Sequence, residues 1–404
     1  MKSSQTAQTR QRKVTYRLYP TNPQADALHA LLRSHQELYN AALQERISAW
    51  QKRRLSISYV AQCKSLTEIR SAFPEWRLAN CSSQQMTLRR LNKAFSAFFR
   101  RIKAGENPGF PRYKSLSRFP GISFKSHGDG WNFNPGKGWR HGTLRLSGVG
   151  QIVCRGKARQ SGIVAASDLC FRQGKWILSL TVVPPIEMRA RDGHTAVAFD
   201  WGVQTLLSGI TDTGQTLIFE NPRLFRAYKD KLTKLRQIVA SKMRGSRRWA
   251  NASKNANDTL AKMARVRTNF LHQLTVRIAR SHKLVAMEEL AVKPMTASWK
   301  DVVGVPRFEA SMKSGLNREI LDTAPAKLMH MLSYKVTDTG GIWLVAPTKT
   351  LKPSQTCPRC GNVKKKELSE RVHSCLLCGY TAPRDVASAQ VVLNWALRTH
   401  QQRL

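Results

Sequence analysis

The feature that most restricts the fold of this chain is a pair of cysteine knuckles near its C-terminus. Two residues separate Cys357 from Cys360, two separate Cys375 from Cys378, and fourteen lie between the pairs. Four thiolates in this arrangement suit a tetrahedral zinc ion, and a site closed by four protein ligands has no open position for catalysis. A glycine follows each second cysteine, where a tight knuckle needs a permissive residue. The sequence therefore predicts a zinc ribbon over residues 351–382 that holds one structural Zn²⁺.

Three carboxylates stand in apolar surroundings at the ends of predicted elements. Asp200 closes a strand-like run that begins at residue 195, Glu288 closes another, and Asp385 opens the last helix. Apolar residues at later turns share one helix face with Asp385, which points this carboxylate at the sheet. A buried carboxylate is costly unless a metal ion or a basic group meets it. Taken alone, Asp200 could face solvent and Asp385 could be a helix cap, but the three together favour one shared site.

Two strand ends and a helix that each supply a carboxylate are the parts of a two-metal nuclease of the RNase H-like class. Such a site holds two divalent cations roughly 3.5–4 Å apart, which activate water and stabilise the leaving oxygen of a phosphodiester. Mg²⁺ suits this chemistry because it is a hard ion, held by few carboxylates and by substrate oxygens. We therefore expect two catalytic Mg²⁺ ions in addition to the structural Zn²⁺.

The charge of the chain indicates a polyanionic partner. Lys and Arg number 67 against 25 Asp and Glu, a formal net charge of +42, and nucleic acid is the usual partner of such a surface. Between Arg226 and Arg280, a predicted helical hairpin carries fifteen Lys or Arg against two Asp. Cations without interspersed acids point to a phosphate backbone. The expected nucleic-acid contacts, in this hairpin and in an aromatic-rich loop before it, are Arg112, Lys114, Arg244, Arg247, Arg248, Arg265 and Arg267.

The hydrophobic patterns predict a protein that mixes helices and strands. Residues 14–19 alternate as a strand, and helices follow it up to residue 103. Short alternating runs with Gly and Pro over residues 105–185 predict an all-β module of barrel or sandwich type. Residues 195–219 predict a meander, and residues 296–315 are polar and expected to be mobile. The second helix is expected to bury Met86, Leu91, Phe95, Phe98 and Phe99.

Neither a membrane nor an oxidising compartment is indicated. The most apolar stretch, residues 176–185, is far shorter than the roughly 20 residues of a spanning helix. The first twelve residues have no apolar region of the kind found in a secretory signal. Without a secretion signal, metal binding explains the clustered cysteines better than disulfides do. We therefore expect a cytoplasmic protein without membrane partners, associated with nucleic acid.

Motifs along nearly the whole chain closely resemble TnpB, the family of RNA-guided nucleases of bacterial insertion sequences, which is related to the compact type V CRISPR effectors. The motifs that carry the resemblance are Tyr16–Pro20 with Gln24, Tyr39-Asn40, Gly109–Lys114, Asp200–Gly202, Glu288–Leu290, Gly315–Asp322, Leu332–Lys335, Ser354–Gly361 and Cys375–Asp385. Their occurrence together and in this order makes the resemblance specific.

The resemblance implies an RNA-guided DNA endonuclease of a bacterial insertion sequence. Such a protein takes a transposon-end RNA as its guide, one protein per RNA, and cuts double-stranded DNA beside a short target-adjacent motif. In a bacterium it would be cytoplasmic and associated with the nucleoid. Carried over to this chain, Asp200, Glu288 and Asp385 are the catalytic carboxylates that bind Mg²⁺. The zinc ligands are Cys357, Cys360, Cys375 and Cys378.

The resemblance also implies a multidomain α+β architecture. Its parts are a disordered basic tail, a β-barrel wedge domain with a helical recognition insertion, and an RNase H-like (RuvC) α/β nuclease domain interrupted by the four-cysteine zinc ribbon. The expected boundaries are residues 1–13 for the tail, 14–22 and 105–190 for the wedge domain, 23–104 for the helical domain, 191–350 and 383–404 for the nuclease domain, and 351–382 for the ribbon.

Two positions depart from the family pattern. The family usually has Asp-x-Asn at the last carboxylate, and here the third residue is Ala387; Ala324-Pro325 stands where an aromatic residue often occurs. The missing amide leaves open an RNA-guided DNA-binding repressor that does not cut. A zinc-ribbon transcription protein explains neither the ordered carboxylates nor the length. Two Thr-Asp-Thr-Gly segments resemble aspartic protease motifs, but both are expected to be turns.

Overall fold

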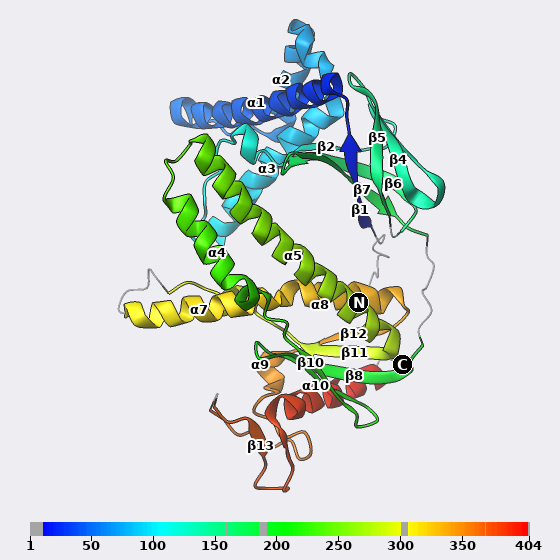
Figure 1. Cartoon of the computed structure of the whole chain (residues 1–404), viewed down its shortest axis with the longest axis vertical. Coiled ribbons are helices and arrows are strands. Elements are labelled where there is room, and N and C mark those ends of the chain that lie inside the picture. The colour runs from blue at the N-terminus through cyan, green and yellow to red at the C-terminus, as the bar shows by residue number, and fades with distance from the viewer. Residues whose placement is uncertain (1–10, 159, 186–191, 300–305, 368, 403–404) are drawn as a thin grey trace. The chain divides into compact units, whose positions relative to one another are not determined.

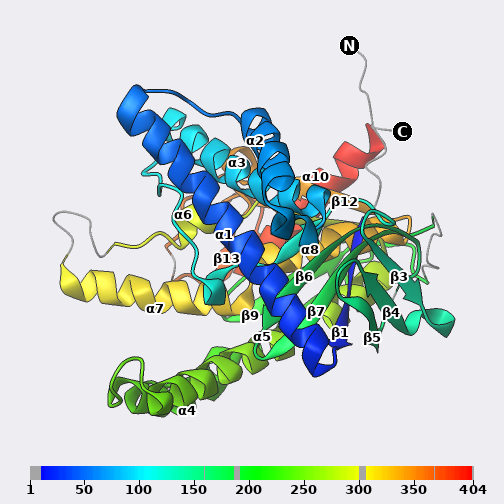
Figure 2. The ribbon, with the colours of Figure 1, turned by 90° about the horizontal axis from the view of Figure 1, so that it is seen from above.

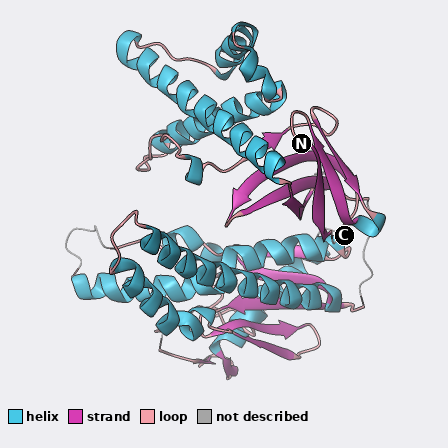
Figure 3. Cartoon of the chain, turned by 45° about the horizontal axis from the view of Figure 1, so that its top comes forward, coloured by secondary structure: helices cyan, strands magenta, loops and turns pink. Residues whose placement is uncertain are grey.

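The computed structural model describes residues 11–158, 160–185, 192–299, 306–367 and 369–402. The chain divides into two compact units, one up to residue 186 and the other from residue 187 onward. Figure 1 shows the elements in chain order, and Figure 3 shows that each unit has a sheet of its own together with helices. The prediction of an α+β protein is confirmed.

The first unit is built on a seven-stranded antiparallel sheet in the order β2-β6-β7-β1-β5-β4-β3. The strands are β1 (Arg12–Tyr19), β2 (Ile122–Phe124), β3 (Trp131–Pro135), β4 (Arg140–Leu146), β5 (Gly150–Lys157), β6 (Ile163–Arg172) and β7 (Lys175–Val183). The N-terminal strand β1 is central, between β7 and β5. The rings of Phe124 at the end of β2 and Trp131 at the start of β3 lie 6.0 Å apart between centroids.

Three helices, α1 (Asn22–Arg53), α2 (Tyr59–Ala72) and α3 (Cys81–Lys103), connect β1 to the rest of this sheet and form one group in Figure 2. Helix α1 starts at a capping box, in which Thr21 accepts from the backbone N–H of Gln24 and Gln24 accepts from that of Thr21. Pro23 in its first turn has a helical φ and needs no hydrogen-bond acceptor. Short 3-10 turns follow at η1 (Pro74–Leu78), η2 (Leu116–Arg118) and η3 (Lys137–Trp139).

The buried face of α3 differs from the prediction. Leu91 is buried as expected, but Phe99 is 54% exposed. Partial exposure also applies to Met86, Phe95 and Phe98. The predicted stripe is wrong at Phe99, and it missed two hydroxyl groups that the helix buries: Thr87 and Ser83 hydrogen-bond the two ring nitrogens of His35 at 2.9 and 3.2 Å. Burial, together with a nearby arginine, lowers the pKa of His35 to about 3, so this imidazole is neutral.

The second unit is built on a five-stranded sheet in the order β10-β9-β8-β11-β12. Its strands are β8 (Thr195–Trp201), β9 (Thr205–Thr211), β10 (Thr216–Glu220), β11 (His282–Glu288) and β12 (Ile342–Ala346). Strands β8 to β10 form the predicted antiparallel meander, whose turn contains Gly214 at φ 83°. Strands β11 and β12 run parallel to β8. The sheet is therefore half antiparallel meander and half parallel.

The helices of the second unit are α4 (Leu224–Ala240), α5 (Arg247–Ser281), α6 (Val292–Met295), α7 (Arg307–Thr323), α8 (Pro325–Asp338), α9 (Thr348–Leu351) and α10 (Arg384–Gln401). They include α5 and α8 on one face of this sheet and α10 on the other. Val197, Phe199 and Met287 pack with residues of α5 and α8. The alternate residues Ala196 and Ala198 pack with α10. Successive strand residues face opposite sides of the sheet. Alternate residues of β8 therefore contact either α5 and α8 or α10.

Several predicted segments end differently or fall outside the described residues. The stretch of residues 296–315 that is expected to be mobile includes the start of α7 at Arg307, and its residues 300–305 lie outside the described residues. The predicted tail is not described for residues 1–10, and β1 begins at Arg12. The sequence also predicts a linker over residues 184–193, of which residues 186–191 lie outside the described range. Within that range no helix has the length and apolar character needed to cross a bilayer.

Candidate metal centres

Asp200 and Glu288 lie at the carboxyl ends of neighbouring parallel strands. The residues before them, Phe199 and Met287, are paired in the register of β8 and β11. Strand alternation places Asp200 and Glu288 on the opposite side from that pair, which is the side covered by α10. Neighbouring strands are about 4.8 Å apart, so the sheet brings both carboxylates to one edge on one face.

Asp385 reaches the same edge from α10. It lies in the first turn of that helix, and Ala389 and Val392 on its face pack into the core beneath the sheet. The small side chains of Ala196 and Ala198 on β8 meet this helix. One turn after Asp385, Ser388 donates a hydrogen bond from Oγ to Oδ1 of Asp200 at 3.3 Å. The helix therefore carries Asp385 to the strand end that bears Asp200.

The electrostatics of these carboxyls favour a cation between them. Burial, with the charges of Glu288 and Asp385, raises the pKa of Asp200 well above its usual range; the Ser388 hydrogen bond and Arg384 lower it in part. Burial also raises the pKa of Glu288 to about 6. A divalent cation would neutralise the repulsion that raises the pKa of Asp200. Oxygen ligands of this kind fit Mg²⁺.

The neighbouring acid Glu289 does not join this group. Its side chain is exposed, whereas that of Glu288 is partly buried. Its backbone is fixed instead, since its N–H donates to the carbonyl of Ala346 at 3.0 Å and its carbonyl accepts from Oγ1 of Thr348 at 2.8 Å. The strand geometry thus distinguishes two adjacent glutamates that look alike in the sequence.

The four cysteines of the ribbon form a second candidate centre. Their Sγ atoms all lie within 4.8 Å of one another. Cys357 and Cys378 have Sγ atoms 3.6 Å apart, and so do Cys360 and Cys375. Zn–S bonds of about 2.3 Å in a tetrahedron put neighbouring sulfurs about 3.8 Å apart. This cluster can therefore hold a zinc ion with little movement of its ligands.

Matching backbone turns support the two cysteine pairs. In each knuckle the glycine after the second cysteine has a positive φ, 77° at Gly361 and 69° at Gly379, and its N–H donates to the carbonyl of the first cysteine of its pair. The strands β13 (Val372–Ser374) and β14 (Thr381–Pro383) then form a short hairpin that leads into α10. The Nη1 atom of Arg384, the first residue of α10, donates to the carbonyls of Glu367 and Glu370 at 2.7 and 3.2 Å. The ribbon is thus tied to the helix that bears Asp385.

The loop that carries Arg112 and Lys114 is fastened along α1. Gln36 and Asn40 donate to the carbonyl of Lys114 at 2.6 and 3.0 Å, and Asn40 accepts from its N–H at 2.9 Å. Gln44, one turn further, accepts from the hydroxyl of Tyr113. Residues four apart share one helix face. Gln36, Asn40 and Gln44 therefore hold the loop from three successive turns of α1. Arg112 remains exposed, and Lys114 is partly exposed.

The predicted basic hairpin is formed by α4 and α5, which pack on each other. Four of its predicted nucleic-acid contacts are exposed arginines: Arg244, Arg247, Arg248 and Arg265. Arg267 has a different setting, since its guanidinium pairs with the buried carboxylate of Asp322 on α7. Asp322 also accepts from the backbone N–H of Phe225 at 2.7 Å, in the first turn of α4. Arg267 therefore has a structural role in the fold, as the partner of Asp322.

The strand register defines a basic surface within the β module, on the outer face of strands β1, β3, β4 and β5. Over their ranges these strands contain no Asp or Glu. Arg17 lies directly opposite Arg155, and Arg140 lies directly opposite Lys157. Like charges opposite each other destabilise a sheet. The guanidinium carbons of Arg17 and Arg155 both lie 4.7 Å from the ring centroid of Tyr19, which is itself 39% exposed.

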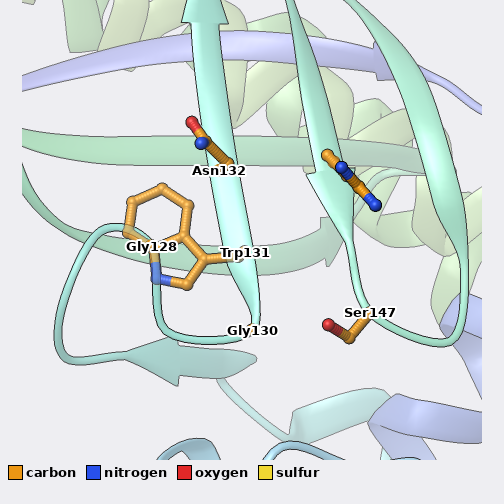
Figure 4. Close-up of a pocket in the computed structure, with 6 residues that line it drawn as sticks. Gly128, Gly130, Trp131, Asn132 and Ser147 are labelled. Atoms are coloured by element: carbon orange, nitrogen blue, oxygen red, sulfur yellow. The ribbon is translucent and has the colours of Figure 1, made fainter.

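A pocket of about 240 Å³ opens beside this face (Figure 4). Its lining comes from the β3–β4 edge and from the glycine turn before β3, and includes Asn132, Arg145 and Ser147. Asn132 and Arg145 are cross-strand partners, and Arg145 is also paired with Gln151 on β5. The sequence shows these polar residues at alternate positions of each strand. Only the register between the strands shows that they lie side by side.

Family comparisons match three parts of the chain. A family described as a probable transposase (OrfB_IS605) matches residues 180–298, and a Cas12f1-like TNB domain matches residues 326–392. A helix-turn-helix domain of the same transposase group matches residues 10–54. In this chain that last segment is the strand β1 followed by the single continuous helix α1.

Two relatives match most of the chain. One from Escherichia coli (strain K12), named "Putative RNA-guided DNA endonuclease InsQ", is 26% identical over 88% of this chain and 85% of its own length. One from Streptomyces pristinaespiralis, named "Putative RNA-guided DNA endonuclease", is 29% identical over 95% of this chain and 88% of its own length. The chain therefore resembles the TnpB family, as its motifs predict.

A solved structure titled "Structure of the mini-RNA-guided endonuclease CRISPR-Cas_phi3" overlaps with 96% of this chain and 92% of its own. The two are 9% identical, and their TM-score is 0.48. A likeness at that score is too distant to assign a fold or a function.

Proposed function

We propose that this protein is an RNA-guided DNA endonuclease that hydrolyses phosphodiester bonds at Asp200, Glu288 and Asp385. The observation that carries the proposal is the meeting of these three carboxylates at one sheet edge, where burial, together with the charges of the other two, raises the pKa of Asp200. The names of the relatives agree with this activity. Bacterial insertion sequences are the proposed source of both the gene and its guide.

The three carboxylates have distinct places in the proposed reaction. The charges of Glu288 and Asp385 both act on Asp200, so we assign Asp200 as the central carboxylate of the set that would hold the ions. Glu288 and Asp385 would complete the ligand set from β11 and α10. Two Mg²⁺ ions held there would activate a water molecule and stabilise the leaving oxygen. The chain itself supplies fixed carboxylates on a rigid strand pair and a helix N-terminus.

The topology supports an assignment of the second unit as an RNase H-like (RuvC) domain. A three-stranded meander continued by two parallel strands, with helices on both faces, places the carboxyl ends of β8 and β11 together. We assign residues 191–350 and 383–404 to this domain and residues 351–382 to the zinc ribbon. In the first unit we assign 14–22 and 105–190 to a β-barrel wedge domain, and 23–104 to a helical recognition domain.

The proposed zinc is structural. Cys357, Cys360, Cys375 and Cys378 complete a tetrahedral site, and the backbone turns that hold them are already formed. The hydrogen bonds of Arg384 connect the ribbon to the start of α10. Loss of the ion would therefore disturb the position of Asp385 as well as the ribbon.

The guide RNA is proposed to lie on the basic surfaces. The outer sheet face carries two pairs of opposed cations without an acid on its strands, and an anionic partner would relieve that repulsion. Tyr19 between two arginines offers a ring beside the phosphate contacts. Arg112 and Lys114 in the clamped loop, and Arg244, Arg247, Arg248 and Arg265 on the hairpin, are further proposed contacts.

The test is a cleavage assay with a reprogrammed guide. The protein, co-expressed with its neighbouring transposon-end transcript, should purify with a defined RNA and cut matching double-stranded DNA beside a short fixed motif in Mg²⁺. Asp200→Ala should abolish cutting and retain RNA-dependent DNA binding, and Glu289→Ala should cut normally. A cut site that stays in place when the guide changes would contradict the proposal. So would equal cutting by RNA-free protein.

The second candidate is an RNA-guided DNA-binding repressor without cleavage. Ala387, which supplies no amide near the carboxylates, is the observation that favours it. The two candidates separate in the same assay, because a repressor binds guide-matched DNA and leaves it intact in saturating Mg²⁺.

A further inference from the structure

Ser388 has an unusual place for a hydroxyl-bearing side chain. It lies in α10, is 2% exposed, and is flanked by Ala387 and Ala389, which are fully buried. A buried hydroxyl needs a hydrogen-bond partner. Within helices, Ser and Thr commonly donate to the carbonyl four residues earlier, and Thr399 of the same helix does so, to Trp395 at 2.8 Å. In the described part of the chain, the hydrogen bond of Ser388 goes instead to Oδ1 of Asp200 on β8, at 3.3 Å.

We infer that Ser388 is a positioning residue, which holds the carboxylate of Asp200 in the orientation that binds the metal ions. This inference rests on the proposed nuclease function. Ser388 follows Asp385 by three residues, so both project from one face of α10 toward the strand end. Residue 387 is alanine and offers no polar group, which leaves the contact with Asp200 to residue 388.

The hydrogen bond acts against electrostatic repulsion. The negative charges of Glu288 and Asp385 both act on Asp200. Without metal ions, this repulsion would favour rotation of the Asp200 carboxylate away from them. A donor on Oδ1 opposes that rotation and would keep the Asp200 carboxylate oriented toward the metal site. Ser388 thus prepares the site before metal binds, and its removal should weaken metal affinity more than the rate at saturating metal.

The test compares Ser388→Ala with Ser388→Thr, Thr399→Ala and Asp200→Ala. Alanine is smaller and favours helix, so Ser388→Ala is expected to fold. Mn²⁺ binding to the zinc-loaded full chain, free of nucleic acid, is followed by the loss of the free-ion electron paramagnetic resonance signal. The Mg²⁺ concentration for half-maximal cleavage is measured on the complex with guide RNA. Thermal melting of each variant is recorded alongside.

Ser388→Ala should weaken Mn²⁺ binding about tenfold and raise the half-maximal Mg²⁺ concentration similarly, as expected for a hydrogen bond to a charged group. Its rate at saturating Mg²⁺ should stay within about threefold of wild type, a split that a merely structural role would not give. Ser388→Thr keeps the hydroxyl and should restore binding. Thr399→Ala removes a hydroxyl that bonds only its own helix, and should leave both readouts unchanged.

Three outcomes would overturn the inference, and they can be told apart. If Asp200→Ala abolishes cleavage and Mn²⁺ binding while Ser388→Ala matches wild type, Ser388 has no positioning role and the nuclease proposal stands. If Asp200→Ala changes neither readout, the metal site itself is misplaced and both proposals fail. A Ser388→Thr variant that melts like wild type yet binds Mn²⁺ as poorly as Ser388→Ala would also refute the role of the hydroxyl.

Discussion

Glu288→Gln should make the metal-free protein more stable while it destroys the proposed nuclease activity. Burial raises the pKa of Glu288 from 4.5 to about 6. The folded state therefore binds a proton more tightly than the unfolded chain, and stability falls as the pH rises from 4.5 through 6. Each pKa unit corresponds to about 1.4 kcal/mol, so ionised Glu288 destabilises the metal-free fold by about 2 kcal/mol above pH 7. Glutamine fills the same space without a charge.

The assay is thermal melting of the full chain in magnesium-free buffer at two pH values. At pH 7.5 the Glu288→Gln variant should be about 2 kcal/mol more stable, which for a unit of this size raises the melting temperature by roughly 4–8 °C. At pH 5 wild-type Glu288 is largely protonated in the folded state, and the difference should shrink to about 0.8 kcal/mol. Added Mg²⁺ should stabilise wild type and leave the variant unchanged.

The matched control is Glu289→Gln, one residue away. Glu289 is exposed and outside the carboxylate group, so its melting temperature should not change at either pH. If Glu288→Gln melts at or below the wild-type temperature at pH 7.5, burial of an ionised Glu288 does not destabilise the fold. An equal gain at pH 5 and pH 7.5 would show that the effect is not one of ionisation. Either result would refute the reasoning.

Three further predictions concern the zinc ribbon, the buried ion pair and the basic sheet face. Metal analysis should find about one Zn²⁺ per chain, and Cys357→Ser should lose it together with cleavage, whereas wild-type cleavage by zinc-free protein would contradict this assignment. Asp322→Ala leaves Arg267 without its partner and should lower the free energy of unfolding in urea by about 3 kcal/mol. The control Asp258→Ala, which removes the exposed partner of Lys254, should lower it by under about 1 kcal/mol. Arg155→Ser should lower RNA affinity and flatten its dependence on salt without loss of stability, because it relieves like-charge repulsion across the strands; an unchanged salt dependence would place the RNA elsewhere.

The sequence by itself determined the local elements and the identity of the metal-binding candidates. Local patterns located the meander, whose turn contains Gly214, and the basic hairpin, because each depends on residues close in the chain. The spacing of Cys357 and its partners specified a four-sulfur cluster for a similar reason, since a knuckle is a local turn. These features need no information about distant parts of the chain.

The sequence failed where a side chain's setting depends on partners far along the chain. The stripe predicted on α3 included Phe99, which is exposed, and missed Thr87 and Ser83, which are buried against His35 of α1. Arg267 looked like its basic neighbours, and only the fold brings Asp322 to it from α7. In both cases the deciding contact joins residues on different helices, and hydrophobic periodicity carries no information about it.

Tertiary structure also decided which groups act together. The register of β8 and β11 places Glu288, and not Glu289, beside Asp200. The packing of α10 on the alanines of β8 brings Ser388 within hydrogen-bond distance of a carboxylate 188 residues away. The opposed arginines of β1 and β5 likewise exist only in the assembled sheet. Sequence patterns report which face of an element is buried, whereas the register between strands and the partner of each face are set by long-range packing.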